Sequence, residues 1–277
     1  MKIDRIVNIY FSPTGATAGV GRMFCARLGE KLCVPVEDVD ITLPSGRRGS
    51  CRFGAEDLPV LAVPTYAGRV PNKLEPYLRE MFRADGAPCC VLVTFGNRAF
   101  ESSLAELADI AWAGGARVVA GGAFSVRHAF SDLVGQGRPT EKDRALIISL
   151  ADRTAQKIQA AGSASEIQVQ AELMPENLQI GPYYVPLMEN GERAMFLKAK
   201  PKVDPERCTC CGTCVQSCPM GAIDQDIVNV PGTCIKCQAC IRACPAGARY
   251  FDDEAFLSHV RMLEKNFTEP AENKIYI

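Results

Sequence analysis

Eight of the chain's fourteen cysteines fall into two nearly identical strings, and this repeat limits what the chain can fold into more than any other feature. Each string has the form Cys-x2-Cys-x2-Cys-x3-Cys-Pro. The strings run from Cys208 to Pro219 and from Cys234 to Pro245. This spacing is typical of the ligands of two iron–sulfur clusters held in one small module.

The spacing also predicts which cysteines share a cluster. A cubic 4Fe–4S cluster takes four thiolates, and three cysteines at x2 spacing can wrap a tight loop around it. The fourth cysteine of each string points away and ligates the other cluster. We therefore assign one cluster to Cys208, Cys211, Cys214 and Cys244, and the other to Cys234, Cys237, Cys240 and Cys218.

Other uses of cysteine explain the pattern less well. A disulfide framework needs an oxidising compartment and gives no reason for a doubled x2-x2-x3 run. Zinc sites use paired CxxC motifs, but a third cysteine at x2 and a fourth before proline are not their signature. Cys210 is interpreted as a bystander between two ligands. The other cysteines have no common spacing and are interpreted as core residues: Cys25, Cys33, Cys51, Cys89 and Cys90.

The composition is that of a soluble globular protein. Of its 277 residues, 47% are hydrophobic and 23% charged, and the net charge is −1. This balance favours neither nucleic acid nor a membrane as partner. No apolar run reaches the roughly 18 residues of a spanning helix, and the start has no secretory cleavage pattern. We expect a cytoplasmic location, and the oxygen-sensitive clusters suggest an anaerobe.

The first 160 residues alternate short apolar runs with helical patterns, which predicts a doubly wound α/β fold around a five-stranded parallel sheet. The expected strands are Ile3–Phe11, Cys33–Ile41, Val60–Pro64, Cys89–Phe95 and Arg117–Phe124. The expected helices are Ala16–Glu30, Asn72–Phe82, Phe100–Ala113 and Glu141–Ala161. Such sheets bind their ligands at the carboxyl ends of the strands.

The loop after the first expected strand carries the first candidate binding site. Ser12-Pro13-Thr14-Gly15-Ala16-Thr17 offers three hydroxyls, and Gly15 allows close backbone approach at a helix N-terminus. It has neither the Gly-x4-Gly-Lys pattern of a nucleoside triphosphate site nor Gly-x-Gly-x-x-Gly. The loop is therefore either a cradle for a monoester phosphate or a plain turn with an N-cap.

Two further loops leave the same edge of the expected sheet. Pro64-Thr65-Tyr66-Ala67-Gly68 follows the third strand, and Thr94-Phe95-Gly96-Asn97-Arg98 spans the end of the fourth strand. Aromatic residues and glycines at strand ends suit a flat ring held between loops, although aromatics in such places are more often ordinary loop anchors. The interpretation depends on three loops meeting at one edge.

On these residues, the N-terminal region resembles the flavodoxin family. The phosphate loop matches in sequence and the two later loops match in position. The whole chain resembles the fused flavodoxin–ferredoxin proteins of the EFR-type ferredoxin family, in which a flavodoxin-like domain precedes a bacterial two-cluster 4Fe–4S module. This resemblance implies bound FMN, with Tyr66 stacked on the isoalloxazine and Ala67-Gly68 near its N5.

The loops depart from ordinary flavodoxins, which are acidic around the flavin. Arg69 and Arg98 could raise the potential of the reduced ring, or they could face solvent or dock the second module. Arg127 and His128 follow the fifth expected strand and could also reach the flavin or a substrate, but a lone loop histidine is usually solvated or structural.

The expected organisation is a flavodoxin-like FMN domain at 1–162, a linker at 163–202, a small α+β ferredoxin domain at 203–250 and a helical tail at 251–277. The sequence favours an electron carrier that relays electrons between FMN and two 4Fe–4S clusters and exchanges them with redox partner proteins. An FMN-dependent reductase of a small organic acceptor is the alternative, so an enzyme stays open. A flavodoxin-like domain without flavin, used only for docking, is a weaker third reading. The oligomeric state stays open.

Overall fold

The computed structural model describes residues 1–47 and 49–277, and its main body is one six-stranded sheet. The order across the sheet is β10-β7-β6-β4-β1-β2. Five of these strands are parallel, and β10 pairs antiparallel with β7. The six strands are β1 (Arg5–Tyr10), β2 (Val36–Asp40), β4 (Asp57–Pro64), β6 (Pro88–Phe95), β7 (Arg117–Ser125) and β10 (Lys274–Tyr276).

The parallel strands follow the order of a flavodoxin-like sheet. Taken by their place along the chain, the five parallel strands lie in the order second, first, third, fourth, fifth, which is the flavodoxin-like doubly wound arrangement. The central strand β6 is buried along its whole length, as expected for a strand covered by helices on both faces. The predicted fold class is confirmed.

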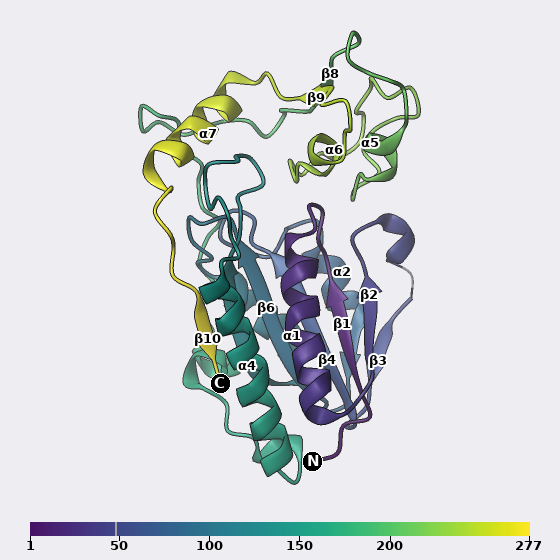
Figure 1. The fold of residues 1–277 in the computed structure, drawn as a ribbon, viewed down its shortest axis with the longest axis vertical. Helices are drawn as coiled ribbons and strands as arrows, with labels where there is room; N and C mark the ends of the chain where they lie inside the picture. Colours follow the sequence, from purple (N-terminus) through teal and green to yellow (C-terminus); the bar gives the residue numbers. More distant parts are fainter. Residues whose placement is uncertain (48) are drawn as a thin grey trace.

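Four helices cover the two faces of the sheet (Figure 1). One apolar core lies under α1 (Ala16–Leu32) and α4 (Glu141–Ala160), and a second lies under α2 (Glu75–Met81) and α3 (Ser103–Ala113). Each helix lies within three residues of its expected bounds. A small parallel pair that the sequence did not predict lies beside the second core, made of β3 (Cys51–Phe53) and β5 (Phe82–Ala84).

The cysteine-rich module lies over the carboxyl edge of the sheet (Figure 1). Its elements are β8 (Lys202–Val203), α5 (Thr213–Gln216), α6 (Ala239–Arg242) and β9 (Arg249–Tyr250), with β8 and β9 antiparallel. Two arginines connect the cysteine-rich module to the sheet domain. Arg47 donates to the carbonyl of Pro219 at 2.6 Å, and Arg242 pairs with Asp132, in the loop after β7, at 2.5 Å.

The segments around the module run back along the sheet domain. The connector forms the short 3₁₀ turns η2 (Ala164–Glu166), η3 (Ala171–Leu173) and η4 (Pro175–Asn177); a further 3₁₀ turn, η1 (Pro44–Gly46), follows β2. The predicted helix in the tail is present as α7 (Glu254–Asn266), and the tail also supplies the short strand β10, which pairs with β7. No helix among the described residues has the length and apolar character to cross a membrane.

Candidate flavin cavity and iron–sulfur cluster sites

A cavity of about 230 Å³ lies at the carboxyl edge of the sheet, between the sheet domain and the cysteine-rich module. The structure brings together the three loops that the sequence singled out. The predicted cofactor-binding residues that line the cavity are Thr14, Ala16, Thr17, Pro64, Thr65, Tyr66, Ala67, Gly68, Thr94, Phe95, Gly96 and Arg98.

The first loop ends in a helix N-terminus with free donors. Gly15 adopts the left-handed conformation with φ of 87°, and α1 begins at the next residue. Among the described residues, nothing accepts a hydrogen bond from the backbone N–H groups of Thr14, Ala16 and Thr17. Unpaired N–H groups at a helix N-terminus form an anion site, so the loop fits a phosphate better than it fits a closed turn.

Two residues predicted to bind the cofactor through this loop do not line the cavity. Ser12 turns its hydroxyl inward, where it accepts a hydrogen bond from the N–H of Ala18 at 3.0 Å. Gly15 supplies the positive φ that turns the chain into α1. In this structure both residues shape the loop, because a short turn must satisfy its own polar groups before it can present others; their part in holding a cofactor stays a prediction.

The second loop is a tight turn against the third. Tyr66 and Arg69 exchange backbone hydrogen bonds of 2.8 and 3.1 Å across Ala67 and Gly68, which have φ of 50° and 77°. The positive φ of Gly68 favours glycine, and a Cβ there would also displace the carboxylate of Glu101. Burial, with the Cys237 thiol close by, raises the pKa of the Tyr66 hydroxyl well above its usual value.

The third loop contains one predicted residue, Asn97, whose side chain is engaged away from the cavity. Asn97 does not line the cavity; its side chain is 2% exposed and donates to the carbonyls of Phe267 and Glu269 at 2.7 and 2.8 Å. Arg98 does line it, with its guanidinium 2.8 Å from Glu101 and 3.7 Å from the centre of the Tyr184 ring.

Arg69 lies away from the cavity. Its guanidinium pairs with the buried Glu106 at 2.5 Å and donates to the carbonyl of Gly181 at 2.7 Å. Of the two arginines in the flanking loops, only Arg98 therefore lies beside the cavity; Arg127, which follows the fifth strand, also lines it.

The cover of the cavity comes from residues that the sequence analysis missed. The connector, the cysteine-rich module and α7 lie over the three loops, and apart from the cluster motif that contains Cys237 no motif marks their residues as cofactor-binding. A run of two tyrosines in the proline-rich connector was the one signal available. The covering residues are Tyr184, Pro186, Phe196, Ile235, Lys236, Cys237, His259 and Leu263.

The chain's two histidines both line this cavity, in complementary hydrogen-bonding states. The N–H of Phe130 donates to Nδ1 of His128 at 3.1 Å, so the ring proton of neutral His128 lies on Nε2. His259 donates from Nδ1 to the carbonyl of Leu187 at 2.8 Å, which leaves its Nε2 as an acceptor. Burial, reinforced by His259, lowers the pKa of His128 to about 3.

The predicted cluster ligands surround two further cavities. One is lined by Cys208, Cys211, Cys214 and Cys244, and the other by Cys218, Cys234, Cys237 and Cys240. No group of three or more His, Cys, Asp or Glu side chains in the described residues is spaced for a single metal ion. Four sulfurs around a cavity are the donor set of a 4Fe–4S cluster, and each set of four is the crossed set expected from the spacing.

Backbone groups already point at the sulfurs. The N–H of Ala222 donates to Sγ of Cys218 and the N–H of Ala248 to Sγ of Cys244, both at 3.2 Å. Such bonds tune a cluster's potential. Burial raises the pKa of the Cys240 thiol to about 12, an effect that the guanidinium of Arg249 opposes. Buried thiols become thiolates readily only beside positive charge, which a metal centre supplies.

The three cavities form a row. Residues Ile235, Lys236 and Cys237 line both the flavin-sized cavity and the neighbouring cluster cavity. Cys240 of that cluster set packs with Cys214 of the other set in one small core. At the far end Cys211 is exposed to solvent.

Comparison with known protein families identifies part of the cysteine-rich module. A family model described as "4Fe-4S binding domain" matches residues 201–224, which include the first cysteine string. No curated protein matches at a significant level.

Solved structures with a similar fold include three flavodoxins. A flavodoxin from Streptococcus pneumoniae TIGR4 is 17% identical with a TM-score of 0.38, and the match covers 56% of this chain and 98% of that one. An archaeal flavodoxin is 15% identical with a TM-score of 0.40, over 57% and 99% of the two chains. A short-chain flavodoxin associated with a bacterial microcompartment is 18% identical with a TM-score of 0.40, over 58% and 100%. The fold assignment itself rests on the strand order.

Proposed function

We propose a specific role in electron transfer, the function suggested by a flavodoxin-like domain joined to a 4Fe–4S binding domain. The chain relays electrons between FMN and two 4Fe–4S clusters and exchanges them with redox partner proteins. The observation that carries this proposal is the segment from Ile235 to Cys237, which lines the flavin-sized cavity on one side and a cluster cavity on the other.

The cavity offers FMN a place for each of its parts. Thr14, Ala16 and Thr17 present their free backbone donors to the phosphate, and the hydroxyls of Thr14 and Thr17 lie at the same end. The ring fits between the loop of Tyr66 and the loop of Arg98. Bound FMN exchanges electrons in single steps, as does each 4Fe–4S cluster.

The exposed end of the row is the place for a partner protein. Cys211 is solvent-exposed, whereas Cys237 is buried and lines the cavity at the carboxyl edge of the sheet domain. A partner that docks at Cys211 reaches the outer cluster, lined by Cys208, Cys211, Cys214 and Cys244, before any other site. The inner cluster, lined by Cys218, Cys234, Cys237 and Cys240, then lies between the outer cluster and the flavin.

The experiment compares two single variants: one lacks a predicted ligand of the outer cluster, and the other lacks a neighbouring cysteine that is not a predicted ligand. Cys211→Ala removes a predicted ligand, and Cys210→Ala removes an exposed cysteine that lines neither cluster cavity. Both proteins are purified without oxygen, and iron, FMN content and the rate of flavin reduction by a reduced low-potential ferredoxin are measured.

We expect about eight irons and one FMN in the parent and in Cys210→Ala. Cys211→Ala should lose about half of the iron and slow flavin reduction at least tenfold while keeping FMN, because the outer cluster is the entry point. Flavin reduction at the parent rate in a protein that lacks the outer cluster would contradict the relay.

An FMN-dependent reductase of a small organic acceptor is the second candidate. The observation in its favour is that the cavity extends past the flavodoxin-like loops to His128, Phe130 and His259, which offer a neutral donor, an aromatic face and an acceptor. Steady-state reduction of small acceptors, compared with electron exchange with a ferredoxin, separates the two functions. Turnover of a small acceptor that His128→Gln abolishes would favour the reductase.

A further inference from the structure

Arg249 is a buried cation at a place where the repeat calls for an apolar residue. The two cysteine strings continue as Pro219-Met-Gly-Ala-Ile223 and Pro245-Ala-Gly-Ala-Arg249, so Arg249 occupies the position of Ile223. Both side chains are inside the module: Ile223 is 5% exposed and Arg249 is 3% exposed. The two halves of the module therefore differ by one positive charge in their interior.

The guanidinium of Arg249 faces the outer cluster cavity. Arg249 opens β9, and pairing with Val203 of β8 fixes its backbone. Its Nη2 donates to Sγ of Cys214 at 3.3 Å and to the carbonyl of Ile227. Arg249 lines the cavity together with all four cysteines of the outer set.

Two donors of this guanidinium have no partner. Nε and Nη1 are buried and form no hydrogen bond with any described residue. No carboxylate in the described residues forms an ion pair with Arg249. A buried cation with unpaired donors is costly, so such groups are normally paired with an anion. The cavity beside it is the place for that anion, because four thiolate ligands give a bound 4Fe–4S cluster a net negative charge.

We propose that Arg249 is the charge partner of the outer 4Fe–4S cluster, with Nε–H and Nη1–H donating to sulfur atoms of the bound cluster. The inference rests on the proposed function, since it requires that cluster. Positive charge and N–H···S hydrogen bonds stabilise the more negative, reduced state, and so raise the reduction potential. Because Ile223 stands at the same position in the other half, Arg249 makes two otherwise similar clusters unequal.

The test measures the potentials of the loaded protein. Arg249→Met removes the charge and the donors at nearly constant length. Lys202→Met is the matched control, because it removes one positive charge from the same small sheet at a side chain that is 60% exposed. Iron content and the two cluster potentials are determined by EPR-monitored titration.

Arg249→Met should lower the equilibrium constant for reduction of one cluster at least tenfold, a shift of about 59 mV for one electron. Lys202→Met should leave both potentials unchanged. Unchanged cluster potentials in an Arg249→Met protein that holds eight irons would overturn the role proposed for Arg249 and leave the proposed function standing. Absence of 4Fe–4S clusters from the parent protein would instead overturn the proposed function.

A second measurement does not depend on the stability of Arg249→Met. In parent protein labelled with ¹⁵N-arginine, pulsed EPR of the reduced clusters should detect weak ¹⁵N coupling to one cluster. The coupling should disappear in Arg249→Lys, which keeps the charge but loses the guanidinium fork. A labelled parent without any ¹⁵N coupling would show that the guanidinium does not contact a cluster.

Discussion

Arg98 is the one cation from the flavin-flanking loops that the structure leaves beside the cavity. A positive charge near a reduced ring stabilises its negative charge, so Arg98→Gln should lower the potential of the flavin's second reduction step. The measurement is a redox titration of the purified protein with its FMN bound. The control is the double variant Arg69→Gln with Glu106→Gln, which removes a buried pair away from the cavity.

Equal shifts in Arg98→Gln and in the double variant would show that the position of the cation does not matter. No shift in either would show that Glu101, which pairs with Arg98 at 2.8 Å, already neutralises it.

His128 sets a pH dependence for stability. Burial lowers its pKa to about 3, against about 6.5 in the unfolded chain, so the unfolded state binds a proton first as the pH falls. Stability should therefore decrease below pH 6.5, by about 1 kcal/mol between pH 7 and pH 5.5. His128→Asn should show a smaller decrease in thermal unfolding temperature over this range. An identical decrease in both proteins would show that His128 is not buried in its neutral form.

The sequence is most informative about residues whose spacing is dictated by chemistry. The eight cysteines could be divided into two sets because cluster geometry requires it, and the structure places each set around one cavity. The side-chain orientations of Ser12 and Asn97 could not be predicted, because a polar side chain in a loop can face a ligand or bond to nearby backbone, and sequence does not distinguish these outcomes.

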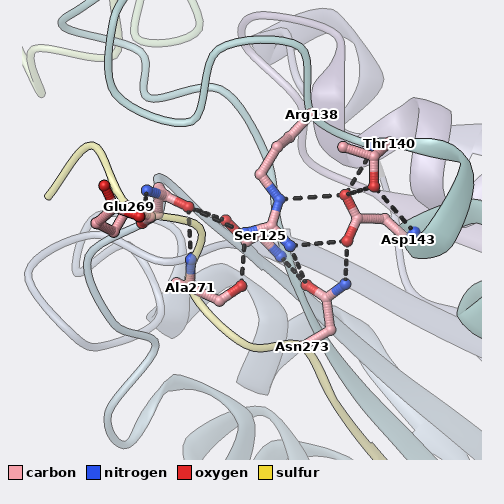
Figure 2. Close-up of polar contacts among 8 residues, drawn as sticks. Ser125, Arg138, Thr140, Asp143, Glu269, Ala271 and Asn273 are labelled. Carbon is pink, nitrogen blue, oxygen red and sulfur yellow. Dashed lines mark hydrogen bonds and ion pairs between the residues drawn. The ribbon is translucent and has the colours of Figure 1, made fainter.

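At the scale of elements, a polar network fixes the C-terminal strand to the sheet domain (Figure 2). Asn273 accepts a hydrogen bond from the N–H of Ser125 at 2.7 Å and donates to Asp143 at 2.6 Å. Arg138 pairs with Asp143 at 2.7 Å, and both side chains are less than 10% exposed. Asn97 joins the same network through its bond to the N–H of Ala271 at 3.0 Å.

Asn273→Ala should release β10 from the sheet. The substitution leaves the N–H of Ser125 without a partner and removes one of the two donors to Oδ1 of Asp143, the other being Arg138; the loss costs about 1–3 kcal/mol. Hydrogen exchange in residues 274–276 should accelerate by at least tenfold, whereas Asn190→Ala, in an exposed turn, should leave it unchanged. Unchanged protection in Asn273→Ala would show that the network does not hold the strand.

The same network should lose its contribution to stability in acid, between about pH 4 and pH 2. Although burial opposes it, hydrogen bonds from Arg138, Thr140 and Asn273 lower the pKa of Asp143 to about 2, below its unfolded value of about 3.9. This stabilisation is complete above pH 4 and is lost as the pH falls toward 2. Pepsin cleavage of the tail, followed between pH 4 and pH 2, should accelerate over that interval. A cleavage rate that is already maximal at pH 4 would contradict the low pKa of Asp143 as the source of this stability.

Elements with a strong local pattern were predictable and those held by tertiary contacts were not. The strand β6 is predictable because burial on both faces leaves an unbroken apolar run in the sequence. The helix α4 is predictable because burial on one face leaves apolar residues at helical spacing. β10 has three residues, and its pairing with β7 depends on the distant network around Asn273. The connector has no period, yet Tyr184 covers the cavity.

At the scale of the whole molecule, the cysteine-rich module closes the cavity of the sheet domain. Arg47 and Arg242 hold the module over the carboxyl edge, and Phe130 packs against Phe256 of α7 with ring centres 4.9 Å apart. As a result, Cys237 is a wall of the flavin-sized cavity as well as a predicted cluster ligand. The proposed relay therefore requires that flavin and inner cluster lie side by side in one chain.

The most direct test is the EPR spectrum of the partly reduced protein with flavin and clusters bound. If a flavin spin lies next to the inner cluster, its signal should relax faster and split through magnetic coupling when that cluster is reduced. The coupling should be lost in Cys237→Ala, which removes a ligand of the inner cluster, and kept in Cys210→Ala. A flavin signal that is the same whether the clusters are oxidised or reduced would contradict the account.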